Sequence, residues 1–170
     1  MTAGEQAENL LGALSLAITD RMDADSADVA LSALQHILDR PSIDRLARVL
    51  GLSSSGTVRL VDRLAAAGYV ERTAGVDRRT ASITLTPAGR REAERVSTNR
   101  QSLLRGALSV LSPAEREQFG ALAGRVLAGM VRPPGATRWT CRLCDTGACG
   151  RPEGRCPVAT AAGWRPDTTP

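Results

Sequence analysis

The stretch LARVLGLSSSGTVRLVDRLAAAGYVERTAGVDRRTASITLTPAGR, Leu46–Arg90, changes its hydrophobic period once, at Gly68. Before this glycine, apolar residues recur at the spacing of an α-helix, with an interruption at Gly51. After it, apolar and polar residues alternate, as they do along a β-strand. Two short helices joined by a turn with glycine are typical of a helix-turn-helix. The stretch therefore predicts a helix-turn-helix followed by a β-hairpin.

The helix-turn-helix is predicted to consist of helices over residues 43–50 and 55–67. Ser42 is the expected N-cap of the first helix, and Ser53 or Ser54 is that of the second. The inward stripe of the second helix is expected to consist of Val58, Val61, Leu64 and Ala65. Its outward side would then carry Ser55, Thr57, Arg59 and Arg63. A short, polar and cationic face can enter a major groove and meet phosphates and base edges.

The β-hairpin is predicted to have strands over residues 69–73 and 80–86, joined by AGVDRR. Asp77, Arg78 and Arg79 lie at or near its tip. A hairpin in this position is a wing. Arginine at a wing tip can insert into a minor groove, because the negative potential of the groove attracts it.

Two helices are predicted before this stretch, over residues 5–21 and 26–39, and Ser26 is the expected N-cap of the second. A long helix is predicted from Pro87 to about Leu111. Each of these segments has aliphatic residues at helical spacing. Since only 2% of the chain is aromatic, the core must be aliphatic.

The last predicted helix runs from Pro113 to about Val131. Ser112 and Glu115 form a capping box at its start, a specific signal for a helix N-terminus. The terminal helices carry more apolar surface than they could bury on one small winged helix. This excess favours a dimer, since an obligate interface resembles a protein core cut in half.

Charge is distributed unevenly along the chain, although its net value is only +4. Residues 1–39 have one Arg against seven acids, a net of −6, and residues 40–91 have ten Arg against four acids, a net of +6. A basic middle segment fits a surface that binds a polyanion such as nucleic acid. The alternative is an arginine-rich face that is simply solvated.

Several classes of protein are disfavoured by what the sequence lacks. No window has 18 uncharged apolar residues, and the first ten residues hold two acids and no basic residue, unlike a secretory signal. We therefore expect a cytoplasmic protein. With one histidine, no glycine-rich phosphate loop and no nucleophile with a plausible histidine partner, no enzyme is expected.

The motifs VDRL (61–64), AGYVER (67–72), DRR (77–79) and LTPAG (85–89) together resemble the MarR family of bacterial transcriptional regulators. The resemblance covers about residues 5–131. It implies a mainly α fold with a small β-hairpin wing, that is, a winged helix-turn-helix with a helical dimerisation region. It also implies a homodimer, in which the first, fifth and sixth helices interlock and two winged helices bind a palindromic operator in double-stranded DNA, as a repressor.

The resemblance assigns roles to particular residues. The groove-facing positions are matched by Ser54, Ser55, Thr57 and Arg59. Asp62 matches an aspartate that braces a wing arginine, here Arg78 or Arg79. Arg63 would contact a phosphate or pair with Asp62 or Glu71.

A small amphipathic effector, commonly phenolic, is also implied between the dimerisation region and the DNA-binding lobe. The sequence does not reveal its pocket, and His36, the single histidine, is more typical of a packed helix residue there. We expect a domain over 1–131, with the winged helix at about 26–86, and a tail over 132–170. The alternative function is a metal-bearing or redox-sensing interaction protein whose winged helix contacts protein rather than DNA.

All four cysteines of the chain lie in the tail, in CRLCDTGACGRPEGRC: Cys141, Cys144, Cys149 and Cys156. In a reducing compartment such a cluster more often binds metal than forms disulfides. Four thiolates can close a tetrahedral site around Zn²⁺, so we expect zinc bound by these residues. An iron–sulfur cluster, a disulfide switch and a tail with incidental thiols are the alternatives. The tail could staple the dimer or fold back on the DNA-binding lobe.

Overall fold

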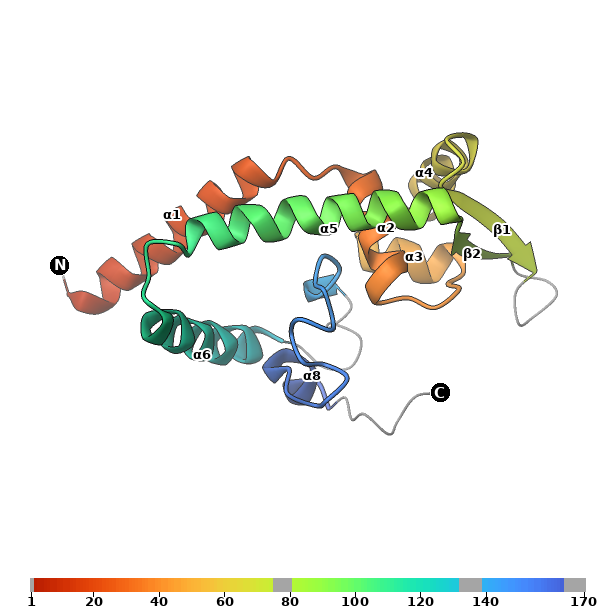
Figure 1. Cartoon of the computed structure of the whole chain (residues 1–170). Coiled ribbons are helices and arrows are strands. Elements are labelled where there is room, and N and C mark those ends of the chain that lie inside the picture. The colour runs from red at the N-terminus through yellow and green to blue at the C-terminus, as the bar shows by residue number, and fades with distance from the viewer. Residues whose placement is uncertain (1, 75–80, 132–138, 164–170) are drawn as a thin grey trace.

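The computed structural model describes residues 2–74, 81–131 and 139–163. It is mainly helical, with one two-stranded antiparallel sheet, as predicted (Figure 1). The elements are α1 (Ala3–Met22), α2 (Ser26–His36), α3 (Ile43–Leu50), α4 (Ser54–Ala66), β1 (Val70–Ala74), β2 (Ala81–Leu85), α5 (Pro87–Ala107), α6 (Pro113–Met130) and α8 (Pro157–Ala161).

The helix-turn-helix forms where its capping signals lie. The Ser42 side chain accepts a hydrogen bond from the backbone N–H of Arg45 at the start of α3. Gly51 ends α3 in the left-handed conformation, with φ 66°, which a glycine adopts without the steric cost of a side chain. Ser53 caps α4 by accepting from the N–H of Gly56. The predicted caps of both helices are confirmed.

The predicted boundaries of α2 are wrong at both ends. Asp25, rather than Ser26, is the N-cap, because its carboxylate accepts from the N–H groups of Ala27 and Asp28. The helix ends at His36 rather than at 39. Arg40 has φ 39° and precedes Pro41, a position where the α conformation is disfavoured. The residues between His36 and Pro41 therefore turn instead of continuing the helix.

The buried stripe of α4 is one residue out of phase with the predicted one. Its buried members are Thr57, Leu60, Val61 and Leu64. Thr57 is 0% exposed, and its hydroxyl donates to the carbonyl of Ser53, so burial leaves no polar group unsatisfied. Val58 is 38% exposed, and Ala65 is exposed too. The prediction that Thr57 faces outward, and that Val58 and Ala65 face inward, is wrong.

The β-hairpin closes the winged-helix core from one side. Its register pairs Val70 with Leu85 and Arg72 with Ile83. Val70, Ile83 and Leu85 are buried against residues of α2, α3 and α4. The N–H of Ile83 donates to the carbonyl of Pro41 at 2.9 Å, which ties the hairpin to the start of α3. The predicted wing is confirmed except for its tip, residues 75–80, which lies outside the described residues.

Helix α5 links the winged helix to the rest of the molecule (Figure 1). Thr86 caps it, as predicted, and it ends at Ala107 rather than near Leu111. Its first turn lies directly on the hairpin, because a Cβ atom on Gly89 would overlap the carbonyl oxygen of Tyr69. The side chains that it buries are all in its first half, and its second half runs beside α1.

Helices α1 and α6 bury little of their own surface. No residue of α1 is buried, and in α6 only Gly124 is buried. The capping box of α6, formed by Ser112 and Glu115, is confirmed. The tail folds back from α6, and Figure 1 shows it between α6 and the winged helix. Within the described residues, no helix is long and apolar enough to cross a membrane.

Candidate functional site

The exposed face of α4 is the first candidate site. It carries the predicted residues Ser54, Ser55, Arg59 and Arg63, all of which are exposed. Val58, rather than the predicted Thr57, lies on this face. The Ser54 hydroxyl donates to Asp44 of α3 at 3.1 Å, which fixes the start of α4 against α3. The face is therefore polar and cationic around one aliphatic side chain.

Asp62 connects α4 to the wing through a residue that the sequence did not single out. Its carboxylate accepts a hydrogen bond from Arg72 of β1 at 2.7 Å and forms an ion pair with it. The predicted partners, Arg78 and Arg79, lie outside the described residues. Both side chains of the pair are about half exposed, so it stabilises the fold by at most about 1 kcal/mol. Its contribution is orientation, because it ties the base of the wing to the exposed face of α4.

The acidic neighbours of Arg63 are engaged elsewhere. Asp62 pairs with Arg72, and Glu71 accepts a hydrogen bond from Thr84 across the hairpin at 3.4 Å. Among the described residues, neither Arg59 nor Arg63 has an ion-pair partner. Two guanidinium groups on an exposed helix face are therefore available to an anionic ligand such as a phosphate.

The four cysteines form the second candidate site. All are free thiols, and they make one cluster with Val158 and Ala159 of α8. Cys141 is hydrogen-bonded to Cys144, and the Cys149 thiol donates to the carbonyl of Thr146 at 3.4 Å. In the described part of the chain, no three His, Cys, Asp or Glu side chains are already arranged as a metal site. Along the chain, Cys141 and Cys144 form the first pair of this cluster, and Cys149 and Cys156 form the second.

The two thiols of the first pair have opposite acidities. The hydrogen bond from Cys141, together with the positive charges of Arg100 and Arg151, lowers the pKa of Cys144 to about 6. The same hydrogen bond and burial raise the pKa of Cys141. Burial also raises the pKa of Cys149. Cys144 is therefore the thiol that most readily becomes a thiolate, the form that binds metal and reacts with electrophiles.

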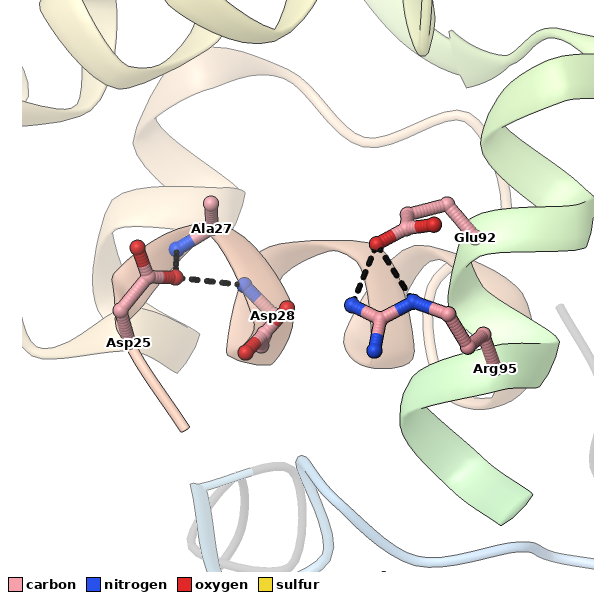
Figure 2. Close-up of polar contacts among 5 residues, drawn as sticks. All are labelled: Asp25, Ala27, Asp28, Glu92 and Arg95. Carbon is pink, nitrogen blue, oxygen red and sulfur yellow. Dashed lines mark hydrogen bonds and ion pairs between the residues drawn. The ribbon is translucent and has the colours of Figure 1, made fainter. Parts of the chain in front are cut away.

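A cavity of 390 Å³ lies where α1, α2 and α5 meet, with Leu143 of the tail in its wall. It is lined by charged side chains of both signs, including Arg21, Asp28, Arg95 and Arg100. Figure 2 shows how Arg95 and Asp28 are held. The Arg95 guanidinium donates to the Glu92 carboxylate at 2.6 and 3.0 Å, and the backbone N–H of Asp28 donates to the Asp25 carboxylate at 2.9 Å. Burial, followed by the charge of Asp25, raises the pKa of Asp28.

His36 does not line this cavity. It is half-buried at the end of α2, and its carbonyl accepts a hydrogen bond from Thr146 of the tail at 3.5 Å. His36 lies instead in the wall of a second cavity, with Leu38, Arg40 and Arg90, so whether it contacts a ligand stays a prediction. Trp164 lies outside the described residues, whereas Trp139 is described and contacts the winged helix.

Residues 28–80 match the model of the MarR family. An uncharacterised helix-turn-helix transcriptional regulator of Bacillus subtilis (strain 168), YwhA, is 34% identical over 86 residues, which are 50% of this chain and 62% of that protein. The match thus spans less than two thirds of YwhA. These relatives are named as regulators, which agrees with the expectation that the chain is not an enzyme.

Solved structures of regulators have the same fold. A MarR family protein from Bacillus stearothermophilus is 25% identical, with a TM-score of 0.68, over 78% of this chain and 99% of that one. The complex of MepR from Staphylococcus aureus with DNA gives 20% identity and a TM-score of 0.56, over 76% and 99%. Residues 28–80 therefore form a helix-turn-helix domain of the MarR family, within a chain that has the fold of MarR-family regulators.

Proposed function

We propose that this protein is a homodimeric transcriptional regulator that binds a palindromic operator and represses from it. The observation that carries the proposal is the exposed face of α4, where Arg59 and Arg63 lack ion-pair partners among the described residues. The brace between Asp62 and Arg72 fixes the wing beside this face. MepR, whose fold is similar, has been solved in complex with DNA.

In this proposal α4 enters the major groove. Arg59 and Arg63 contact phosphates or guanine edges, and Ser54 and Ser55 approach the backbone near the start of the helix. Val58 takes the place first assigned to Thr57. An aliphatic side chain at that position can contact the methyl group of thymine, which a threonine turned into the core cannot reach.

The wing supplies the second set of contacts. Arg78 and Arg79 belong to the loop that joins β1 to β2, and we propose that at least one enters the minor groove. The pair of Asp62 and Arg72 holds the strands of the wing at a fixed angle to α4. Arg72 is thus a positioning residue, and the wing arginines are contact residues.

The dimer is supported by the apolar surface of the terminal helices. α1 exposes Leu10, Leu11, Leu14 and Leu16, and α6 exposes Phe119, Leu122, Val126, Leu127 and Met130. A monomer rarely leaves so much aliphatic surface in water, and a second copy of this chain would cover it. A two-fold axis through this region would present two copies of α4, which a palindromic operator requires.

The cavity between α1, α2 and α5 is the place that we propose for a small-molecule effector. Its arginines, Arg21, Arg95 and Arg100, favour a ligand with a carboxylate or phenolate group. It lies between the dimerisation helices and the winged helix, so a ligand there could change their relative orientation. A hydroxybenzoate that raises the melting temperature of wild type, but not of Arg95→Ala, would support this assignment.

The DNA-binding proposal is tested by a gel shift with the promoter region beside the gene of this protein. Arg63→Ala should weaken binding by about 10- to 100-fold and reduce the salt dependence by about one ion. Arg105→Ala, which removes the same charge from an exposed position in the far half of α5, is the matched control and should leave affinity nearly unchanged. Equal effects of the two variants, or salt-insensitive binding, would contradict the proposal.

A further inference from the structure

We propose that Cys141, Cys144, Cys149 and Cys156 bind one Zn²⁺ ion per chain, and that the zinc-bound segment is a strut between the helix-turn-helix and α6 that raises operator affinity. The proposal of the zinc site does not depend on the proposed function. The effect on affinity rests on the DNA-binding function proposed above.

The first argument is the composition of the segment over residues 139–163. Helix α8 has only five residues, and the buried side chains of the segment are Cys141, Cys156, Val158 and Ala159, with Cys144 and Cys149 half-buried beside them. Two aliphatic side chains cannot order a segment of this size by burial alone, and small modules of this kind depend on a metal or on disulfides. The four thiols are the groups of this segment that a metal would bind.

The second argument is the arrangement of the sulfur atoms. Cys141 with Cys144 and Cys149 with Cys156 are two pairs along the chain that meet in one cluster, where Cys141 lies near both Cys144 and Cys156. No three donors in the described part of the chain yet surround one point, so zinc must draw the two pairs together. An all-sulfur set suits a tetrahedral Zn²⁺ site, and hard cations such as Mg²⁺ prefer oxygen ligands.

Charge near the cluster fits a thiolate site. Zn²⁺ with four thiolates has a net charge of −2, which is costly to bury unless cations lie nearby. Arg100 of α5 and Arg151 of the tail are close enough to the first cysteine pair to act on it electrostatically. A cationic surrounding of this kind would offset the charge of the loaded site.

The strut reaches the helix-turn-helix through Trp139. A Cβ atom on Gly51 would lie 2.5 Å from Cζ3 of the Trp139 ring, so the indole rests on the turn between α3 and α4. The guanidinium of Arg142 stacks on the same ring, 3.8 Å from its centroid. Arg142 lies between Cys141 and Cys144 in the sequence. A shift of the first cysteine pair would therefore reach, through Arg142 and Trp139, the turn that positions α4.

The other end of the strut lies on α6. Pro157, which follows Cys156, rests on Gly124, where an added Cβ atom would lie 2.9 Å from the proline Cγ. Val131, just after α6, and Ile37, just after α2, both pack against the cysteine cluster. Gly124 is the only buried residue of α6, so the tail is the part of this chain that covers the helix.

A third contact joins the strut to α5. Asp145 accepts a hydrogen bond from Gln101 at 3.1 Å through one carboxylate oxygen, and its other oxygen accepts from the N–H groups of Gly147 and Ala148. The segment is thus held by the winged helix, α5 and α6 at once. In a dimer built on α1 and α6, the distance between the two copies of α4 depends on how rigidly these parts are connected. A loaded strut would preorganise that distance and raise operator affinity.

The zinc site is tested on the full chain purified without oxygen. We expect one zinc per chain by elemental analysis, no visible absorption, and loss of zinc in Cys141→Ser/Cys144→Ser. Absorption at about 400 nm would identify an iron–sulfur cluster and overturn the zinc assignment. Two disulfides with no metal would overturn it as well.

The strut is tested through Trp139 in a Trp164→Phe background, where Trp139 is the only tryptophan. Adding Zn²⁺ to the metal-free protein should shift its fluorescence, and an unchanged spectrum would overturn the strut. This measurement does not involve DNA, so it remains decisive if the protein fails to bind an operator, a result that would count against the proposed function alone.

The effect on DNA is tested by measuring operator affinity with and without zinc. Removal of zinc by a chelator should weaken binding of wild type by about tenfold, within the usual range for coupled sites. Trp139→Ala should retain one zinc per chain but lose this response, and Trp139→Phe, which keeps an aromatic ring on Gly51, should preserve part of it. Operator affinity that is unchanged or increased after zinc removal would overturn the coupling.

Discussion

The winged helix and the helices around it bury their apolar side chains to very different extents. The core of α2, α3, α4 and the hairpin is closed within one chain, and Leu31, Leu46, Leu60 and Ile83 are almost completely buried. By contrast, within the described residues, α1 has no fully buried residue and α6 has one, Gly124, which the tail covers. The core of the winged helix is thus complete within one chain, whereas the dimer and the zinc site that we propose would cover α1, α6 and the tail.

The strongest test of this difference uses one substitution in both regions. Leu46 is 0% exposed in α3, and Leu46→Ala should lower the free energy of unfolding by about 2–5 kcal/mol at any protein concentration, because it leaves a cavity. Leu16 is 66% exposed in α1, and Leu16→Ala should act mainly on dimer formation. Urea unfolding at several protein concentrations, with sedimentation, separates the two effects. A concentration-independent loss of similar size in both variants would contradict the comparison.

A smaller effect distinguishes the two halves of α5. Gly89→Ala places a Cβ atom on the carbonyl oxygen of Tyr69, so we expect a loss of about 1–3 kcal/mol from the forced separation of α5 and the hairpin. Gly106 has nothing within 4 Å of an added Cβ atom. Gly106→Ala should therefore stabilise the helix, by up to about 1 kcal/mol. Thermal unfolding of the two variants checks the opposite signs.

The corrected phase of α4 predicts that neighbouring residues have different roles. Thr57→Ala should lower stability by about 1–2 kcal/mol, since it removes a buried methyl group and a hydrogen bond to Ser53. Val58→Ser should change stability by less than about 0.5 kcal/mol but weaken operator binding. Denaturation and gel shifts on the same preparations measure both effects. A loss of DNA binding in Thr57→Ala together with a loss of stability in Val58→Ser would show that Thr57 faces outward.

The smallest predicted effect is the pH dependence due to Asp28. Its pKa is raised in the folded protein, chiefly by burial, so the folded state holds the proton more tightly than the unfolded state does. Its contribution to stability is therefore present at low pH and is lost as the pH rises through the raised pKa. Asp28→Asn should remove this loss. Melting temperatures of the two proteins should converge at acidic pH and diverge, in favour of the variant, toward neutral pH.

Local signals predicted much of the fold. Ser42, Ser53, Thr86 and the capping box at Ser112 each mark a helix start, because the side chain that satisfies the first backbone N–H groups is adjacent in sequence. The change to a two-residue period located the hairpin. These features depend only on residues that are a few positions apart.

The predictions fail where a tertiary contact determines which residue is buried or which residues pair. Thr57 and Val58 have similar shapes, and only the core shows which of them is buried, since Thr57 can satisfy its hydroxyl within the helix. Asp62 pairs with Arg72 because the hairpin returns beside α4. The docking of Trp139 on Gly51 joins residues that are far apart in the chain and carries no periodic signal. Sequence reasoning offered two positions for the tail, at the dimer or on the DNA-binding lobe, but not the contact that places it.

Gly51 meets two independent requirements, and this limits how the turn of the helix-turn-helix can vary. Its φ of 66° alone would admit Asn, which tolerates the left-handed conformation better than most residues. The indole of Trp139, however, occupies the space that any Cβ atom would need. The mutational tolerance of this one position therefore reports the docking of Trp139: Asn at position 51 is compatible with the turn, but only where the indole has moved off it.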